Sequence, residues 1–377
     1  MNSKLIELQI FHLNDGIDSI VVAALLADGT IGFGQGIPAG YAGETIENAI
    51  FAAKTVLAES LKNLAPKTIT HLYQKAYDLP YIGEDGNIIH AARCAVELAL
   101  LDAYGKYFKS DLTSLVDWLG FGKFTATDGS IHEIKPTITL DGNDPAILKT
   151  IRKHRFRGIS DFKLNTYKNF LQTIRKIYNQ YQAKLQSGQM TLRFDAKGQW
   201  DVDTALATCQ KMDNLCICSV EQPLAIDDNS HWLALSDLTG MILTADESLV
   251  KFSDGRYLAE NQLIDCFDIK ISKNGGLLPA IRLAELAGSH EIDVQLGKTT
   301  HESSILAAAG KRFLQQVPGV VFTEIGVGLS RHDIAMGKNN TFFNKYQVNE
   351  GFGLGISVEI AKISKIIVAN AHKVNFE

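Results

Sequence analysis

Eight short β-rich runs alternate with helical stretches from about Lys135 onward, and this alternation constrains the fold more than any other feature of the sequence. Strand–helix–strand units give parallel pairing, so eight in succession predict an α/β fold that closes as a TIM (β/α) barrel. An open, doubly wound sheet is the alternative that the pattern leaves open. The runs are KPTITLDG, ISDFKLN, MTLRFDAKG, CICSVEQP, MILTADES, CFDIKIS, IDVQLG and VVFTEIG.

Charged residues stand at the ends of four successive runs. Asp195, Glu221, Asp246 and Lys270 are separated by 26, 25 and 24 residues, which is one strand–helix unit each time. In a barrel they would lie at one height on neighbouring strands, at the C-terminal rim where active sites are built. A single acid there is usually a helix cap, but three together would repel one another unless a cation lies among them. Carboxylates without cysteine or histidine favour Mg²⁺, with Mn²⁺ also possible.

The region before the barrel predicts an α+β domain. LIELQIFHL and SIVVAALLA read as strands joined at Asn14-Asp15-Gly16, and a turn at Asp28-Gly29 leads into TIGFGQG. Two helical patterns follow, GETIENAIFAAKTVLAES and NIIHAARCAVELALLDAYGKYF. Small residues form one wide face of the second pattern, which permits close packing against a neighbour.

Composition and charge exclude several classes of protein. The 377 residues carry a net charge of -5, so neither nucleic acid nor an anionic membrane surface is an expected partner. No run approaches the roughly 18–20 apolar residues of a membrane span, and the N-terminus lacks the apolar stretch of a signal peptide. The five cysteines read as reduced core residues. We therefore expect a cytoplasmic protein.

Several motifs strongly resemble the enolase superfamily, in particular its muconate-lactonizing-enzyme and mandelate racemase family. VEQP around Glu221, ADES around Asp246 and DIKISKNGG around Lys270 carry the resemblance in the barrel. GTIGFGQG and AARCAVELALLDAYGK resemble the family's N-terminal domain, and EGFGLGISVE resembles the segment that returns to it. The resemblance implies a modified TIM barrel over residues 126–345, with an α+β capping domain formed by residues 1–125 and the C-terminal segment 346–377.

The same resemblance implies the chemistry. Members of the family abstract a proton α to a carboxylate and stabilise the resulting enediolate with Mg²⁺. Asp195, Glu221 and Asp246 match the metal ligands, and Lys270 matches the acid/base lysine on one face of the substrate. A fixed cation suits this reaction because the second negative charge must be stabilised as it develops.

The opposite face departs from the family pattern, which has a Lys-x-Lys pair on the second barrel strand. Here the run is Gly158-Ile-Ser-Asp161-Phe-Lys163-Leu-Asn165. In the favoured register Lys163 matches the first lysine, and Asn165 takes the place of the second, the acid/base. In the other register Lys163 matches the second lysine and Asp161 the first. Asn165 cannot titrate, so it would only hydrogen-bond.

Further residues are candidates for substrate binding. Lys197 stands where the family commonly has asparagine, and we expect its amine to point into the pocket. Gln295, Lys298 and Glu302 follow the seventh strand, where relatives place groups near the substrate; a helix-capping role for Glu302 remains open. Glu324 ends the eighth strand and is expected to orient a rim lysine. The first hairpin is short where relatives carry a longer capping loop, which implies a wetter mouth or a larger ligand.

Counting acid/base groups favours one type of reaction. Lys270 serves one face, and Asn165 leaves the other without a titratable group. We therefore predict a cycloisomerase or syn-eliminating lyase acting on a small carboxylate, with muconate cycloisomerase and o-succinylbenzoate synthase as analogies. The alternative is a racemase or epimerase of amino-acid derivatives or dipeptides, with Lys163 as second base. A second alternative is a catalytically impaired metal-binding relative that serves as scaffold or sensor. We also expect a homo-oligomer.

Overall fold

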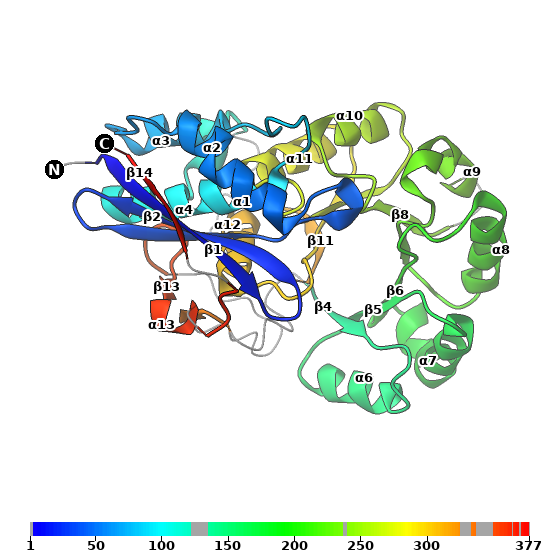
Figure 1. Cartoon of the computed structure of the whole chain (residues 1–377). Coiled ribbons are helices and arrows are strands. Elements are labelled where there is room, and N and C mark those ends of the chain that lie inside the picture. The colour runs from blue at the N-terminus through cyan, green and yellow to red at the C-terminus, as the bar shows by residue number, and fades with distance from the viewer. Residues whose placement is uncertain are drawn as a thin grey trace.

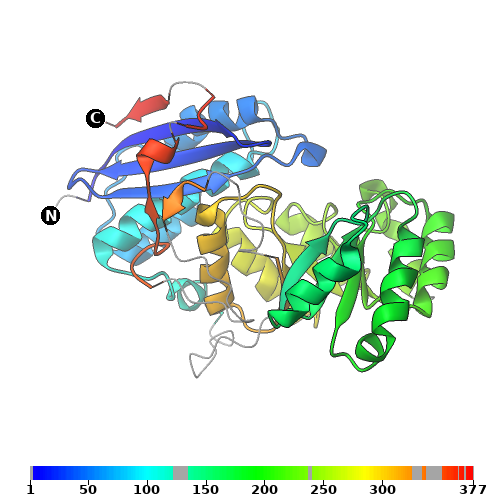
Figure 2. The same ribbon diagram turned by 90° about the horizontal axis from the view of Figure 1, so that it is seen from below.

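The structure is a computed structural model in which residues 3–121, 135–236, 240–324, 333–336, 350–363, 365–368 and 371–376 are described. It has two parts, which we call the cap and the barrel (Figure 1). The cap contains the N-terminal elements, drawn in blue and cyan, and the barrel strands and helices run from green to orange. Figure 2, from below, shows the final strand lying against the N-terminal sheet.

The cap is built on an antiparallel sheet of four strands in the order β14-β1-β2-β3. The turn between β1 and β2 has Gly16 at φ 89°, and Gly29 has the same φ in the next turn, so both predicted turns use a residue that tolerates positive φ. The C-terminal strand pairs with β1, which confirms that the end of the chain returns to the cap. The strands are β1 (Leu5–Asn14), β2 (Asp18–Leu26), β3 (Ile31–Gly36) and β14 (His372–Asn375).

Helices cover this sheet, and the long helix α4 (His90–Phe108) packs directly on β3. Asp102 of α4 accepts hydrogen bonds from the backbone N–H of Phe33 and of Leu354, each at 3.0 Å. One buried carboxylate therefore ties β3, α4 and the C-terminal segment together. The other cap helices are α1 (Ile46–Lys54), α2 (Val56–Ser60), α3 (Ile69–Tyr77) and α5 (Leu115–Trp118).

The first helical pattern of the sequence forms two helices rather than one. Thr55 separates α1 from α2 with a non-helical backbone (φ -110°, ψ -97°), and its hydroxyl donates to the carbonyl of Phe51 at 2.9 Å. A β-branched hydroxyl residue competes for backbone hydrogen bonds in this way, which explains the break.

The barrel confirms the predicted architecture. Its eight strands pair in parallel and close in the order β10-β11-β4-β5-β6-β7-β8-β9, which rules out the open sheet. Each predicted run contains one strand. They are β4 (Lys135–Leu140), β5 (Asp161–Asn165), β6 (Thr191–Asp195), β7 (Ser219–Glu221), β8 (Ile242–Ala245), β9 (Cys266–Ile269), β10 (Asp293–Leu296) and β11 (Val320–Thr323).

Helices connect consecutive barrel strands and bury apolar faces against them. Trp232 is fully buried, and Trp200 stacks on Phe194, so these two side chains pack in the core. The helices are α6 (Ile147–Phe156), α7 (Phe170–Gln186), α8 (Val202–Asp213), α9 (Trp232–Ser236), α10 (Phe252–Glu260), α11 (Leu277–Ser289) and α12 (Ser304–Gln316).

A small sheet of β12 (Ala335–Met336) and β13 (Ser357–Val358), followed by α13 (Ile360–Ile363), leads the chain back to the cap. Among the described residues no helix has the length and hydropathy needed to cross a membrane. All five cysteines are free thiols; Cys94, Cys209 and Cys266 are buried as predicted, whereas Cys216 and Cys218 are half-buried.

Candidate active site

The ends of neighbouring barrel strands bring the predicted site residues to one level. The register pairs Asn165 with Asp195 and Asp195 with Glu221, across β5, β6 and β7. Asp246 and Lys270 each come one residue after their strands, β8 and β9. The equal spacing in the sequence therefore becomes equal height in the barrel, because each unit adds one strand and one helix.

Among the described residues, Glu221, Asp246 and Asp268 form a close group of carboxylates, in which one oxygen of each lies within 4.8 Å of one oxygen of the others. This group shares two residues with the predicted ligand set. Asp195 lies beside it on β6, and its Oδ1 accepts a hydrogen bond from the backbone N–H of Lys197 at 2.9 Å. Burial, followed by the charge of Glu221, raises the pKa of Asp195.

Asp268 is a site residue that the sequence reasoning missed. It lies on β9 two residues before Lys270, so the alternation of side chains along a strand would have placed it on the same face. Neither of its oxygens accepts a hydrogen bond from a described residue, although the Nζ of Lys270 is 3.1 Å from Oδ2. Burial raises the pKa of Asp268 to about 7.

Three buried or largely buried lysines neutralise part of this negative charge. Lys163 lies 3.1 Å from Oε1 of Glu221 and also pairs with Glu324. Lys270 pairs with Asp246, and burial alone would lower its pKa, but Asp246 and Asp268 raise it. The third is Lys273, described next.

Lys273 is a second residue that the sequence reasoning did not single out. Its Nζ donates to Oδ1 of Asp246 at 2.8 Å and to the carbonyl oxygens of Asp246 and Asp268 at 2.9 and 2.7 Å. This amine holds the ends of β8 and β9 together. Its position in KNGG, three residues after Lys270, was the available signal.

The residues present fit a divalent cation. Five carboxyl groups face three ammonium groups here, so the acids outnumber the lysines; they are Asp195, Glu221, Asp246, Asp268 and Glu324 against Lys163, Lys270 and Lys273. Buried charge without compensation is costly, and the unbonded oxygens of Asp268 show that these side chains do not satisfy one another. Oxygen donors of this kind suit Mg²⁺.

The two candidate acid/base positions lie on opposite walls. In the closed strand order β5 and β9 are four strands apart in either direction, so Asn165 faces Lys270 across the barrel, with Asp195, Glu221 and Asp246 on the strands between. Lys163 precedes Asn165 by two residues on β5, so it lies on the same face but deeper in the barrel. There its amine contacts the carboxylates of Glu221 and Glu324.

Below this level a separate network fills the barrel. Arg193 donates to both carboxylate oxygens of Asp161 and, through Nη1, to Oε1 of Gln295 at 2.7 Å. The amide of Gln295 donates in turn to Oε2 of Glu221 at 2.9 Å. Gln295 therefore lies beneath Glu221 and does not line the pocket. The predicted contact of Gln295 with the substrate is not supported by this position.

A cavity of about 650 Å³ opens above these groups, between the loop after β3 and the barrel mouth. Lys197 and Lys298 line it, as do Asn165, Lys163, Lys270 and Glu324. Lys197 is exposed at the rim with φ 55°. Glu302 is buried outside the lining, and burial raises its pKa to about 8. It does not cap a helix: α12 begins at Ser304, and its cap is Ser303.

The tip of the first hairpin reaches the mouth of the barrel. A Cβ placed on Gly16 would lie 3.1 Å from Cε1 of His301, so the short turn packs on that histidine. Gln35 of β3 is buried and does not line the pocket. Its Oε1 accepts hydrogen bonds from the N–H and hydroxyl of Ser303, at 3.0 and 2.7 Å.

The fold and the site define a (β/α) barrel enzyme with carboxylates and lysines at the C-terminal ends of its strands. Two family models match the chain: the mandelate racemase / muconate lactonizing enzyme N-terminal domain over residues 13–120, and the enolase C-terminal domain-like model over residues 146–362. The chain therefore belongs to the enolase superfamily, in the muconate-lactonizing-enzyme-like family of isomerases and lyases.

Relatives of two reaction types are similar to the chain. It is 24% identical to an N-succinyl-L-Arg/Lys racemase of Bacillus cereus, over 93% of this chain and 90% of the relative. It is 26% identical to a muconate cycloisomerase of Acinetobacter lwoffii, over 92% and 87% respectively. Its fold matches the muconate lactonizing enzyme of Pseudomonas putida with a TM-score of 0.82 at 23% identity, covering 97% of this chain and 99% of that one.

Proposed function

We propose that the protein is a Mg²⁺-dependent cycloisomerase or syn-eliminating lyase that removes the proton α to the carboxylate of a small substrate. Lys270 transfers the proton, and Asn165 on the opposite wall holds the substrate by hydrogen bonds. The observation that carries the proposal is the pair of opposite walls, of which one has an amine at substrate level and the other an amide that cannot titrate. A syn elimination or cycloisomerisation needs one acid/base only.

Asp195, Glu221 and Asp246 are the proposed ligands of Mg²⁺, because they lie on the three consecutive strands between Asn165 and Lys270. Bound there, the ion would supply positive charge against the enediolate as it forms. Positive charge among the carboxylates would also oppose their upward pull on the pKa of Lys270. In this proposal Asp268, 3.1 Å from Lys270, positions that amine rather than binding the ion.

Loading with Mg²⁺ is expected to raise the melting temperature, because the ion binds a charge cluster that only the fold assembles. The stabilisation by mass action is about 2.7 kcal/mol at one hundred times Kd. Glu221→Gln should reduce this Mg²⁺-dependent shift, while Glu260→Gln, at an exposed helix position, should keep it. Differential scanning fluorimetry with and without Mg²⁺ measures the shift. If saturating Mg²⁺ does not change the melting temperature of the wild-type protein, the proposed metal site is wrong.

The ligand set has its own test. Asp195→Asn should remove most of the Mg²⁺-dependent shift, whereas Asp268→Asn should leave it in place. The reverse result would assign the third ligand to Asp268, in line with the tighter grouping of its oxygens with Glu221 and Asp246.

The mouth of the pocket provides candidate contacts for the substrate. Lys197 and Lys298 add two amines at the rim, where a second carboxylate or another anionic group of the substrate would lie. Lys197→Asn should raise KM about tenfold and change kcat less than twofold, because a charge contact present throughout the reaction is uniform binding. Asparagine accepts the positive φ of this position, so the loop is preserved.

Steady-state kinetics measure this effect, with Lys211→Asn on α8 as the matched exposed control. If Lys197→Asn has the kinetics of Lys211→Asn, Lys197 does not contact the substrate.

A second candidate function is racemisation or epimerisation of an amino-acid derivative or dipeptide. Its support is Lys163, an amine on the wall opposite Lys270 that also lines the pocket, together with the racemase among the relatives. Against it, Lys163 lies deeper than Asn165, and although burial alone would lower its pKa, the carboxylates of Glu221 and Glu324 raise it.

Proton exchange in D₂O separates the candidates. The protein is incubated with a panel of carboxylates that includes muconate-type diacids, succinylated amino acids and dipeptides, and ¹H NMR records loss of the α-proton and the product formed. Ring closure or elimination supports the proposal, and rapid inversion at the α-carbon would favour the second candidate. No exchange with any member of the panel, in protein that binds Mg²⁺, would instead favour a scaffold or sensor role. Assembly into a homo-oligomer stays a prediction.

A further inference from the structure

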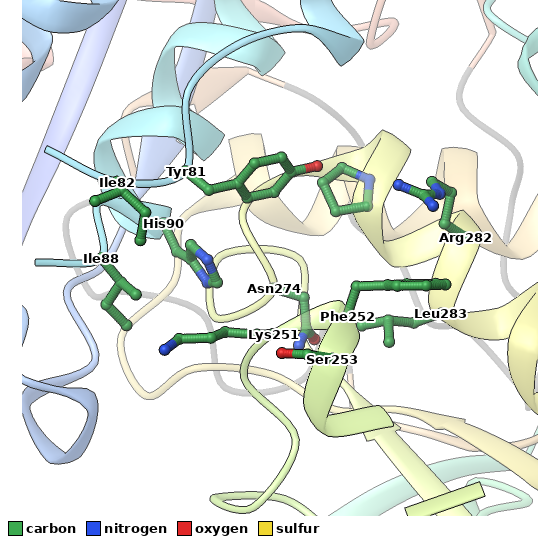
Figure 3. Close-up of a pocket in the computed structure, with 11 residues that line it drawn as sticks. Tyr81, Ile82, Ile88, His90, Lys251, Phe252, Ser253, Asn274, Arg282 and Leu283 are labelled. Carbon is green, nitrogen blue, oxygen red and sulfur yellow. The ribbon is translucent and has the colours of Figure 1, made fainter. Parts of the chain in front are cut away.

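A second pocket lies between the cap and the barrel, away from the catalytic mouth (Figure 3). Its volume is about 230 Å³, room for roughly seven or eight water molecules at about 30 Å³ each. Residues of the segment that leads into α4 form one wall, and the start of α10 and the face of α11 form the others. It shares no residue with the carboxylate and lysine cluster of the catalytic site.

The walls of this cap–barrel pocket are largely apolar. Ile88 and Leu283 are buried side chains, Phe252 is half-buried, and Ile82 is 44% exposed at the edge. Figure 3 shows these side chains around a common space, with Ile82 and Ile88 on the cap side and Phe252 and Leu283 on the barrel side. Burying an apolar ligand here would remove these surfaces from water, at about 25 cal/mol per Å².

A cation without an acidic partner stands at one side of the pocket. The guanidinium carbon of Arg282 lies 4.3 Å from the ring centre of Phe252 and 5.1 Å from that of Tyr77. No ion pair or hydrogen bond to another described residue satisfies this guanidinium, and stacking leaves its N–H edge available. Lys251 lies on the opposite side of the space and is exposed. The pocket thus combines apolar walls with uncompensated positive charge.

Two polar side chains of the pocket, His90 and Asn274, are already committed to other partners. The ring of His90 donates through Nδ1 to the carbonyl of Lys273 at 2.8 Å, and burial lowers the pKa of this histidine to about 4, so it is neutral. Asn274 accepts from the backbone N–H of Lys270 at 2.9 Å and donates to the carbonyl of Leu249 at 2.8 Å. These groups hold the loop after Lys270, so the guanidinium of Arg282 is the charged group beside the apolar walls that is suited to anchor an anionic ligand.

We propose that the cap–barrel pocket binds a small monocarboxylate with an apolar body, such as an aromatic or branched-chain acid, at a site separate from the catalytic pocket. The carboxylate pairs with the N–H edge of Arg282, and the apolar body packs against Phe252, Leu283 and Ile88. Arginine suits this role because its planar donors match a carboxylate in two parallel hydrogen bonds. The proposal does not depend on which reaction the enzyme catalyses.

The location is tested directly with 4-bromobenzoate. Crystals of the full chain are soaked with this acid, and the anomalous signal of bromine locates every bound molecule. We expect a bromine site between Phe252 and Leu283, in addition to any in the catalytic pocket. Bromine only in the catalytic pocket, at ten times the Kd measured in solution, would overturn the proposal.

The chemistry is tested in solution by isothermal titration calorimetry with the same acid. Arg282→Met, which keeps the apolar stem, should weaken binding at this site at least tenfold, and Arg282→Lys should weaken it less. Arg256→Met is the matched control, because Arg256 is exposed on α10 outside the pocket. Equal affinity of Arg282→Met and Arg256→Met would refute the role of Arg282. If Arg282→Met fails to fold, Arg282→Lys is compared with the wild type, and equal affinity of the two would refute the role of Arg282.

Discussion

Replacing Lys270 with alanine is expected to reduce exchange of the substrate α-proton at least about 1,000-fold, within the range that a positioned acid/base contributes. In the proposed mechanism Lys270 is the acid/base on its wall, and Asn165 at the facing position cannot titrate and so cannot replace it. ¹H NMR in D₂O measures the exchange, with the substrate that the panel identifies.

Asn165→Ala is the matched comparison, because it changes the opposite wall at the same level. We expect it to slow exchange less than about tenfold, since it removes hydrogen bonds and no proton-transfer group. Equal losses in the two variants, or a loss in Lys163→Ala as large as that in Lys270→Ala, would support two-base chemistry. Lys270 also pairs with Asp246, so the Mg²⁺-dependent melting shift of Lys270→Ala must be retained for the result to concern proton transfer.

Gly34→Ala is expected to lower the free energy of unfolding by about 3 kcal/mol or more, because overpacking of a rigid contact has this effect. A Cβ on Gly34 would lie 2.0 Å from the carbonyl oxygen of Ala95 in α4, and both partners of the contact are backbone. Gly32 and Gly36, on the same face of β3, meet α4 equally closely, at 2.0 and 1.9 Å. The helix cannot move away from Gly34 without also losing its packing against Gly32 and Gly36.

Gly240→Ala provides the control, because a Cβ there meets nothing within 4 Å and the backbone is not in the left-handed region. Its stability should change by less than about 1 kcal/mol, through the smaller entropy of the unfolded chain. Urea unfolding followed by circular dichroism measures both variants. If Gly34→Ala is as stable as Gly240→Ala, β3 and α4 are not in backbone contact.

The close contact of β3 with α4 also shows why part of the cap was predictable. Alternating glycines in GFGQG and the small residues of AARCAVELALLDAYGK have matching sizes, although they are far apart in the sequence. The pattern therefore predicted a helix with a closely packed face. It did not identify β3 as the partner, because that pairing depends on the path of the chain between them.

The sequence by itself determined the eight strands and the common position of Asp195, Glu221, Asp246 and Lys270 at the strand ends, and it favoured a barrel over an open sheet. These follow from local periodicity and from the nearly constant length of each strand–helix unit, which places equivalent residues at equivalent points on successive strands. Only the tertiary structure decided which side chains meet inside the barrel. It brought Asp268 and Lys273 to the carboxylates, placed Gln295 beneath Glu221, and engaged Lys163 with Glu221 and Glu324. Such contacts join strands distant in the sequence, and they depend on barrel closure and on side-chain depth, which spacing along one chain does not encode.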